Sequence, residues 1–146
     1  MTPPRMAIFA ALLISMSASA ALNLNERAAF REACELSRYT CKGIRPPWVR
    51  ESIFVDKVGA WGYYFGGRTI WLSPNLTTEQ RYVVMVHEMV HYLQVYEDEK
   101  GFPQTAPGES CVREEEAYEI SDKVVRRLGL QDKIPLRLNL LRAQCV

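Results

Sequence analysis

Apolar residues recur every three or four positions in several segments of this 146-residue chain, which is the spacing that places them on one face of a helix. The pattern predicts a first helix over residues 22–39 and two long helices over residues 78–96 and 111–128. The tail, residues 133–146, has the spacing of one short final helix.

Residues with known capping preferences mark the ends of these helices. Asn25 can accept hydrogen bonds from the free N–H groups at the start of the first helix. Thr77 and Gln80 form a capping box ahead of the second helix. Gly129 follows the third helix, where a residue with positive φ commonly ends a helix.

Between the first two helices, the chain is rich in aromatic and β-branched residues, and glycines divide it. We expect two or three strands, at about residues 52–58, 61–65 and 68–72. Gly66-Gly67 should form a hairpin turn, because both residues accept positive φ.

Two segments break the regular pattern. Pro46-Pro47 forces an extended connection after the first helix, and the polar residues 97–110, which contain Gly and Pro, predict a loop. No internal repeat or second domain is evident. We therefore expect a single α+β domain over residues 21–146, in which a short twisted antiparallel sheet packs on the helices.

The first twenty residues have the layout of a secretory signal peptide. Arg5 supplies a basic start, residues 6–16 are apolar but too few to cross a bilayer, and Ala18-Ser19-Ala20 is a small-residue cleavage site. Removal of residues 1–20 would place the mature protein in the periplasm or outside the cell, with no stable membrane span. The alternative is an uncleaved N-terminal anchor.

The charge balance argues against nucleic acid as a partner. The chain has a formal net charge of +1 at pH 7. Loss of the signal removes one arginine and no acidic residue, which leaves the mature chain near neutral. No run of basic residues stands out, whereas phosphate binding needs clustered positive charge.

Four cysteines in an exported chain predict two disulfides. We favour Cys34–Cys41, which would clip the end of the first helix to the following loop, and Cys111–Cys145, which would tie the tail to the body. The other pairings stay open. A cysteine metal site is disfavoured, because the C-x-x-C spacing is missing.

Both histidines of the chain fall in the segment HEMVH, within the second long helix. His87 and His91 lie on one face, so two imidazoles can bind one metal ion, and zinc suits such ligands. Glu88 is offset by about 100° around the helix, so it can lie beside the metal and act as a base on water. The alternative is a pair of core histidines hydrogen-bonded to backbone or tyrosine; it is disfavoured because burying imidazoles without partners is costly.

A catalytic zinc site needs a third protein ligand. No further histidine exists, so the ligand must be a carboxylate, and the segment CVREEEAYEISDKVV is the richest source. Glu114 lies on a mainly apolar helix face with Ala117, Ser121 and Val125, so we favour it as the third ligand. Glu115 shares a face with Glu119 and Asp122 that reads as solvated, and Glu116 is intermediate.

His87-Glu88-x-x-His91 followed downstream by Glu114-x-x-Ala117 resembles the gluzincin type of zinc metallopeptidase. The chain also resembles small exported bacterial proteins with HEMVHYLQ-like and REEEAY-like segments. The likeness in layout covers most of the mature chain, although only the two motifs are specific. It implies a zincin-like domain with zinc on His87, His91 and Glu114, and Glu88 as the general base.

One position departs from this resemblance. Several gluzincins carry an aspartate four residues after the ligand glutamate, where it orients a ligand histidine, but here that residue is Tyr118. Either Tyr118 has another role, or the ligand is Glu115 with Glu119 as the orienting carboxylate. Glu116 stays open as a further alternative ligand. The candidates for stabilising the developing oxyanion are not ranked; they are Tyr63, Tyr92, Arg113 and Tyr118.

These features together predict a zinc-dependent hydrolase of peptide bonds in the exported compartment, with a peptide or protein as substrate. Residues 68–72 are a candidate edge strand for pairing with an extended substrate. The alternative is a non-catalytic zinc-binding exported module that binds a partner or the cell envelope. The small size of the chain and the tyrosine at position 118 favour this second class.

Overall fold

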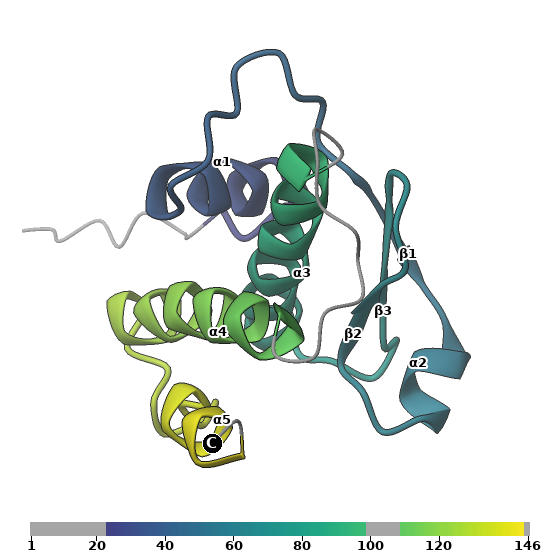
Figure 1. Ribbon diagram of the computed structural model, residues 1–146. Coiled ribbons are helices and arrows are strands. Elements are labelled where there is room, and N and C mark those ends of the chain that lie inside the picture. Colours follow the sequence, from purple (N-terminus) through teal and green to yellow (C-terminus); the bar gives the residue numbers. More distant parts are fainter. Residues whose placement is uncertain (1–22, 99–108, 145–146) are drawn as a thin grey trace, which may run out of the picture.

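The computed structural model describes residues 23–98 and 109–144, and it confirms the expected α+β class. Helix α3 stands in the centre, with α1 and α4 on one side and the sheet on the other (Figure 1). The elements in chain order are α1 (Glu26–Leu36), β1 (Trp48–Glu51), α2 (Ile53–Lys57), β2 (Gly62–Tyr64), β3 (Thr69–Leu72), α3 (Thr78–Asp98), α4 (Glu109–Arg127) and α5 (Leu138–Gln144).

Helix α3 begins where the capping box predicts. The Gln80 N–H donates to Thr77 Oγ1 at 3.2 Å, and the Thr77 N–H donates to Gln80 Oε1 at 3.0 Å. Because α3 is covered by helices on one side and by the sheet on the other, it is buried along most of its length. Its fully buried side chains, which form the centre of the core, are Met85, Val86, Met89, Val90 and Leu93.

The ends of the other helices also follow local sequence signals. Asn25 caps α1 by accepting from the Ala28 N–H at 2.9 Å. Gly129 has a φ of 67° and follows α4. Buried Asp122 accepts from the N–H groups of Arg137 and Leu138 at 3.2 and 3.1 Å and so fixes the start of α5. The expectation that Asp122 is solvated was therefore wrong.

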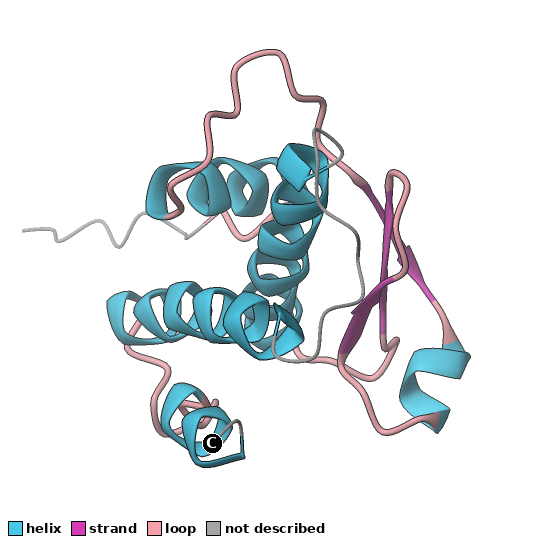
Figure 2. Cartoon of the chain, viewed as in Figure 1, coloured by secondary structure: helices cyan, strands magenta, loops and turns pink. Residues whose placement is uncertain are grey.

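The sheet is mixed rather than antiparallel throughout (Figure 2). Its strand order is β1-β3-β2: β1 pairs with β3 in parallel, and β2 pairs with β3 antiparallel. The hairpin turn between β2 and β3 is confirmed, since Gly66 and Gly67 have φ values of 107° and 70°. β3 is the central strand, so the expectation of an edge strand at residues 68–72 was wrong; the edge strands are β1 and β2.

The strand expected over residues 52–58 is also wrong. Ser52 accepts from the Phe54 N–H at 3.2 Å and caps the short helix α2 in its place. The third strand of the sheet is β1 instead, and it directly follows the Pro46-Pro47 segment. Its backbone pairs with residues about twenty positions later in the chain, from Trp48↔Thr69 to Glu51↔Leu72, which local propensity does not reveal.

Disulfide Cys34–Cys41 is present and ties the end of α1 to the following loop, with the two Cα atoms 5.9 Å apart. Cys111 is also disulfide-bonded, and its expected partner, Cys145, lies outside the described residues. So do the expected signal peptide at residues 1–20 and most of the loop expected over residues 97–110. In the described part of the chain, none of the helices combines the length and apolar character needed to cross a membrane.

Candidate metal and catalytic site

The two histidines of α3 converge on one carboxylate of α4. His87 Nε2 lies 3.2 Å from Glu114 Oε2, and His91 Nε2 lies 3.0 Å from Glu114 Oε1. The two Nε2 atoms are 3.2 Å apart. Ligand atoms from all three residues lie within 4.8 Å of one another, so this group could hold a metal ion.

The helix arrangement brings these three side chains together. His87 and His91 are one turn apart on α3 and project on the same side. Helix α4 packs against α3, with Ala117 and Ser121 of its inward face buried, and this packing carries Glu114 to the imidazoles. The side chains of His87, His91 and Glu114 are 12%, 15% and 37% exposed, so the two imidazoles are largely buried and the carboxylate is partly exposed.

The carboxylate of Glu114 is in the charge state that binds a metal cation. Burial tends to raise the pKa of Glu114, but hydrogen bonds from His87 and His91 outweigh burial and hold this pKa well below its ordinary value. Burial also lowers the pKa of His91, yet the hydrogen bond to Glu114 and the neighbouring carboxylates raise it overall. An ionised carboxylate between two imidazoles is a donor set of two nitrogens and one oxygen, which fits zinc.

Glu88 lies next to this group but on a different side of α3. Its side chain is only 6% exposed. Burial raises the pKa of Glu88, and the nearby histidines act in the opposite direction. A carboxyl group with a raised pKa beside a metal-binding group has the properties of a general base that can later return its proton.

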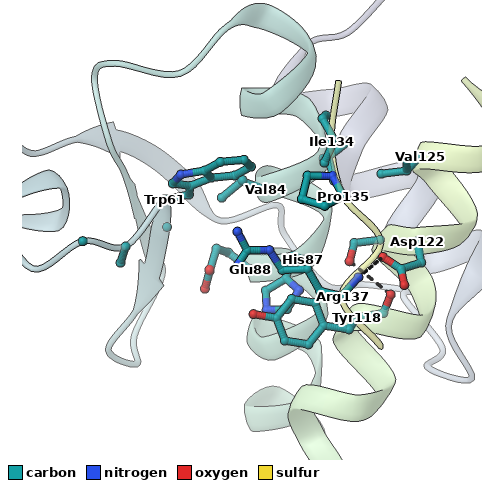
Figure 3. A pocket seen from close by; sticks show the side chains of 15 residues that line it. Trp61, Val84, His87, Glu88, Tyr118, Asp122, Val125, Ile134, Pro135 and Arg137 are labelled. Atoms are coloured by element: carbon teal, nitrogen blue, oxygen red, sulfur yellow. Dashed lines mark hydrogen bonds between the residues drawn. The ribbon is translucent and has the colours of Figure 1, made fainter. Parts of the chain in front are cut away.

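Two cavities meet at Glu88 and His87. One, of about 450 Å³, runs along β2 and reaches all three candidate ligands. The other, of about 280 Å³, extends between Trp61, Val84 and the segment from Ile134 to Arg137 (Figure 3). The Arg137 guanidinium lies 5.3 Å from the centre of the Trp61 ring at the border of this second cavity. The site is thus accessible from the edge of the sheet.

The two alternative ligands point elsewhere. Glu115 Oε1 accepts from Arg142 Nε at 2.6 Å, and Glu116 Oε2 accepts from the Tyr39 hydroxyl at 2.5 Å. Glu119 pairs with Lys123, so it does not orient a histidine. Of the three adjacent glutamates, Glu114 alone joins the histidines in the metal-binding group.

Tyr118, at the position where several gluzincins carry an aspartate, contacts the site through its ring. The ring centre lies 4.4 Å from that of His87. Burial, and secondarily the charge of Glu114, raises the pKa of Tyr118, so the phenol stays protonated. Tyr118 and Arg113 line the cavity with the candidate ligands. Tyr63 also lines this cavity and stacks on Phe65, whereas the Tyr92 hydroxyl donates to the Arg45 carbonyl.

Several residues of the site were not found from the sequence. Gln94 is 2% exposed, and its amide lies 2.8 Å from His91 Nδ1; a polar residue three positions after a ligand, on a buried helix, was the available signal. Gly62 and Arg137 reach the site through tertiary packing alone, which no local pattern indicates. Comparison with protein-family models, curated proteins and solved structures finds no match for this chain.

Proposed function

We propose that this protein is an exported zinc-dependent hydrolase of peptide bonds. The observation that supports it most is the convergence of His87, His91 and Glu114 beside the buried carboxyl group of Glu88. The same four residues fill the HExxH-plus-glutamate pattern of the sequence. The opening onto two cavities leaves room for a substrate next to the base.

In this mechanism Glu88 handles the proton. Zinc, when bound, supplies a positive charge that polarises the peptide carbonyl and acidifies the attacking water. Glu88 accepts the proton of that water and then donates it to the leaving amine. The phenol of Tyr118 stays protonated, so it can donate a hydrogen bond to the oxyanion that develops on the carbonyl.

The shape of the site favours an extended peptide as substrate. β2 is an edge strand, so its side away from β3 is not paired within the described sheet. Gly62, Tyr63 and Tyr64 of this strand line the cavity that contains the histidines and Glu114. A peptide running along β2 would hydrogen-bond to its backbone and pass directly over the site.

The proposed location is the periplasm or the exterior of the cell. The Cys34–Cys41 disulfide fits an oxidising compartment, and the sequence of residues 1–20 has the features of a signal peptide. Peptides or proteins of that compartment are the proposed substrates.

A Glu88→Gln variant tests the proposal. Wild-type protein should copurify with or take up stoichiometric zinc and cleave members of a broad peptide library, and a chelator should abolish cleavage. Glu88→Gln should retain zinc and lose at least about a hundredfold in kcat, since a general base contributes 10²–10⁴-fold. Wild-type protein that binds zinc but cleaves nothing would contradict the hydrolase.

One observation favours a second function, that of a zinc-binding module for a partner. β1 and α2 expose large apolar side chains that do not belong to the site: Trp48, Ile53, Phe54 and Val58. Exposed apolar groups of this kind often mark interaction surfaces. If the zinc-loaded protein lacks peptidase activity, this second function becomes the better one.

A further inference from the structure

Gln94 connects His91 to two acceptors on α4. Gln94 Nε2 lies 3.0 Å from the Arg113 carbonyl oxygen and 2.9 Å from Glu116 Oε2. Both are acceptors, so the amide nitrogen must face them and Gln94 Oε1 must face His91 Nδ1. His91 Nδ1 therefore donates, so the ring nitrogen left to supply a lone pair to a bound metal is Nε2, which faces His87 and Glu114.

Glu116 is itself held in place by the segment after α1. Its Oε2 accepts from the Tyr39 hydroxyl, and its Oε1 lies 3.5 Å from Arg38 Nε. Tyr39 is 7% exposed and stands inside the loop that Cys34–Cys41 closes. Burial and the hydrogen bond to Glu116 raise the pKa of Tyr39 to about 12, so its hydroxyl remains a donor at physiological pH.

The partners in this series fix the direction of each hydrogen bond. Tyr39 donates to Glu116, Glu116 accepts from Gln94, and the carbonyl of Gln94 accepts from His91. The series runs from the loop after α1 through α4 to α3 and ends on one side of the metal-binding group. The ring of Tyr118 packs against His87, whereas this series ends at His91.

We propose that Gln94, Glu116 and Tyr39 are positioning residues that fix the ring orientation and tautomer of His91, and so set the affinity and geometry of the metal site. This inference rests on the proposed zinc site. Position 118 has no carboxylate that could orient a ligand histidine. The inference assigns that orienting function to Gln94 on α3, which Glu116 on α4 holds in place. Groups that orient a ligand in this way commonly alter metal affinity 10- to 100-fold.

The chain contains a matched control cluster of the same chemistry. The Tyr82 hydroxyl donates to Glu32 Oε2 at 2.5 Å, and Arg127 pairs with the same carboxylate. Tyr82 is 3% exposed, which is as buried as Tyr39. None of these three residues contributes to the metal-binding group. Tyr82→Phe therefore removes a buried phenol–carboxylate hydrogen bond without touching the proposed series.

The experiment compares zinc affinity, by competition with a chromophoric chelator, across variants of the full mature chain. Gln94→Leu should weaken zinc binding 10- to 100-fold, and Tyr39→Phe should weaken it about three- to tenfold, because it acts through two further hydrogen bonds. Tyr82→Phe should leave zinc affinity unchanged even where it lowers thermal stability. Absorption spectra of the cobalt-loaded proteins should change for the first two variants and not for Tyr82→Phe.

An exchange of partners distinguishes positioning from general stability. Gln94→Glu alone places two carboxylates together and should weaken zinc binding. Gln94→Glu with Glu116→Gln restores an acceptor for His91 and a donor between the two side chains. It still leaves a carboxylate oxygen against the Arg113 carbonyl, so zinc affinity should recover in part relative to Gln94→Glu alone. Equal zinc affinity of Tyr39→Phe and wild type, or no recovery in the double variant, would overturn the inference alone. Wild-type protein that binds no zinc would overturn the proposed function with it.

Discussion

Gly62 of β2 lies directly against Glu88 of α3. A Cβ atom at position 62 would stand 2.8 Å from Glu88 Oε1 and 2.5 Å from Val84 Cγ1. These separations are shorter than real Cβ atoms adopt, so a larger residue at 62 must push the helix or the carboxyl group away. Strand β2 thus packs closely against one side of the candidate base, Glu88. This close packing is possible because residue 62 is a glycine and has no side chain.

Gly62→Ala is expected to lower both stability and the proposed activity. Forcing an extra carbon into a packed contact costs about 1–3 kcal/mol, and displacement of Glu88 should reduce kcat. Urea unfolding and peptide cleavage measure the two effects. Adding Val84→Ala should restore part of the stability, because it relieves the contact with Val84, but should leave kcat low. Full wild-type stability in Gly62→Ala would show that β2 does not press on α3.

Replacing single glutamates at the start of α4 identifies the third ligand. Glu114→Gln is expected to weaken zinc binding by more than about 100-fold, since loss of a ligand should exceed the effect of an outer group. Glu115→Gln is the matched control. It only breaks the exposed pair with Arg142, which contributes at most about 1 kcal/mol, so zinc affinity should stay near wild type. Titration with a competing chelator measures both, and the reverse order would place Glu115 on the metal.

Features encoded by neighbouring residues were predictable from the sequence. The capping box of Thr77 and Gln80 begins α3, and Gly66-Gly67 turns the hairpin between β2 and β3. The proximity of Glu114 to the two histidines could also be predicted. The spacing of His87 and His91 and the apolar face of α4 each follow from helix geometry, and two such helices must pack by those faces.

Features that depend on distant residues were not predictable. β1 exists because its backbone pairs with β3, and the order of the strands decides that β2, like β1, is an edge strand. The series from Tyr39 to His91 joins residues 77 positions apart at its Tyr39–Glu116 step. Asp122 shows the same limit. Its neighbours on the helix suggested a solvated face, but its carboxylate is buried and accepts from the N–H groups of Arg137 and Leu138 at the start of α5.

Removing the Cys34–Cys41 disulfide is expected to lower stability and zinc affinity together. In the chain-entropy model, a disulfide that closes a loop of this size stabilises the folded state by about 2–3 kcal/mol. Zinc affinity should fall in the same direction as in Tyr39→Phe, because Tyr39 lies within the loop. The double variant Cys34→Ser/Cys41→Ser is preferable to a reductant, which would also act on disulfide-bonded Cys111. Unchanged urea unfolding in this variant would mean that the loop is held by packing alone.

Tyr39 should make stability depend on pH in the alkaline range. Burial, then the hydrogen bond to Glu116, raises its pKa from 10.0 in the unfolded chain to about 12 in the folded protein. The folded state therefore favours the protonated phenol. This contribution is fully present below pH 10 and is lost as the pH rises from 10 to about 12.

The comparison that checks this is the free energy of unfolding of wild type and Tyr39→Phe between pH 8 and pH 12, measured in urea on metal-free protein. Phenylalanine cannot ionise, so the advantage of the wild type should be constant up to about pH 10 and then shrink by about 1–2 kcal/mol. The tyrosinate absorbance of the wild type should show one late-titrating group that is missing from Tyr39→Phe. A constant difference in stability across this range would mean that the Tyr39 hydroxyl is not held by Glu116, and the series that ends at His91 would lose its first member.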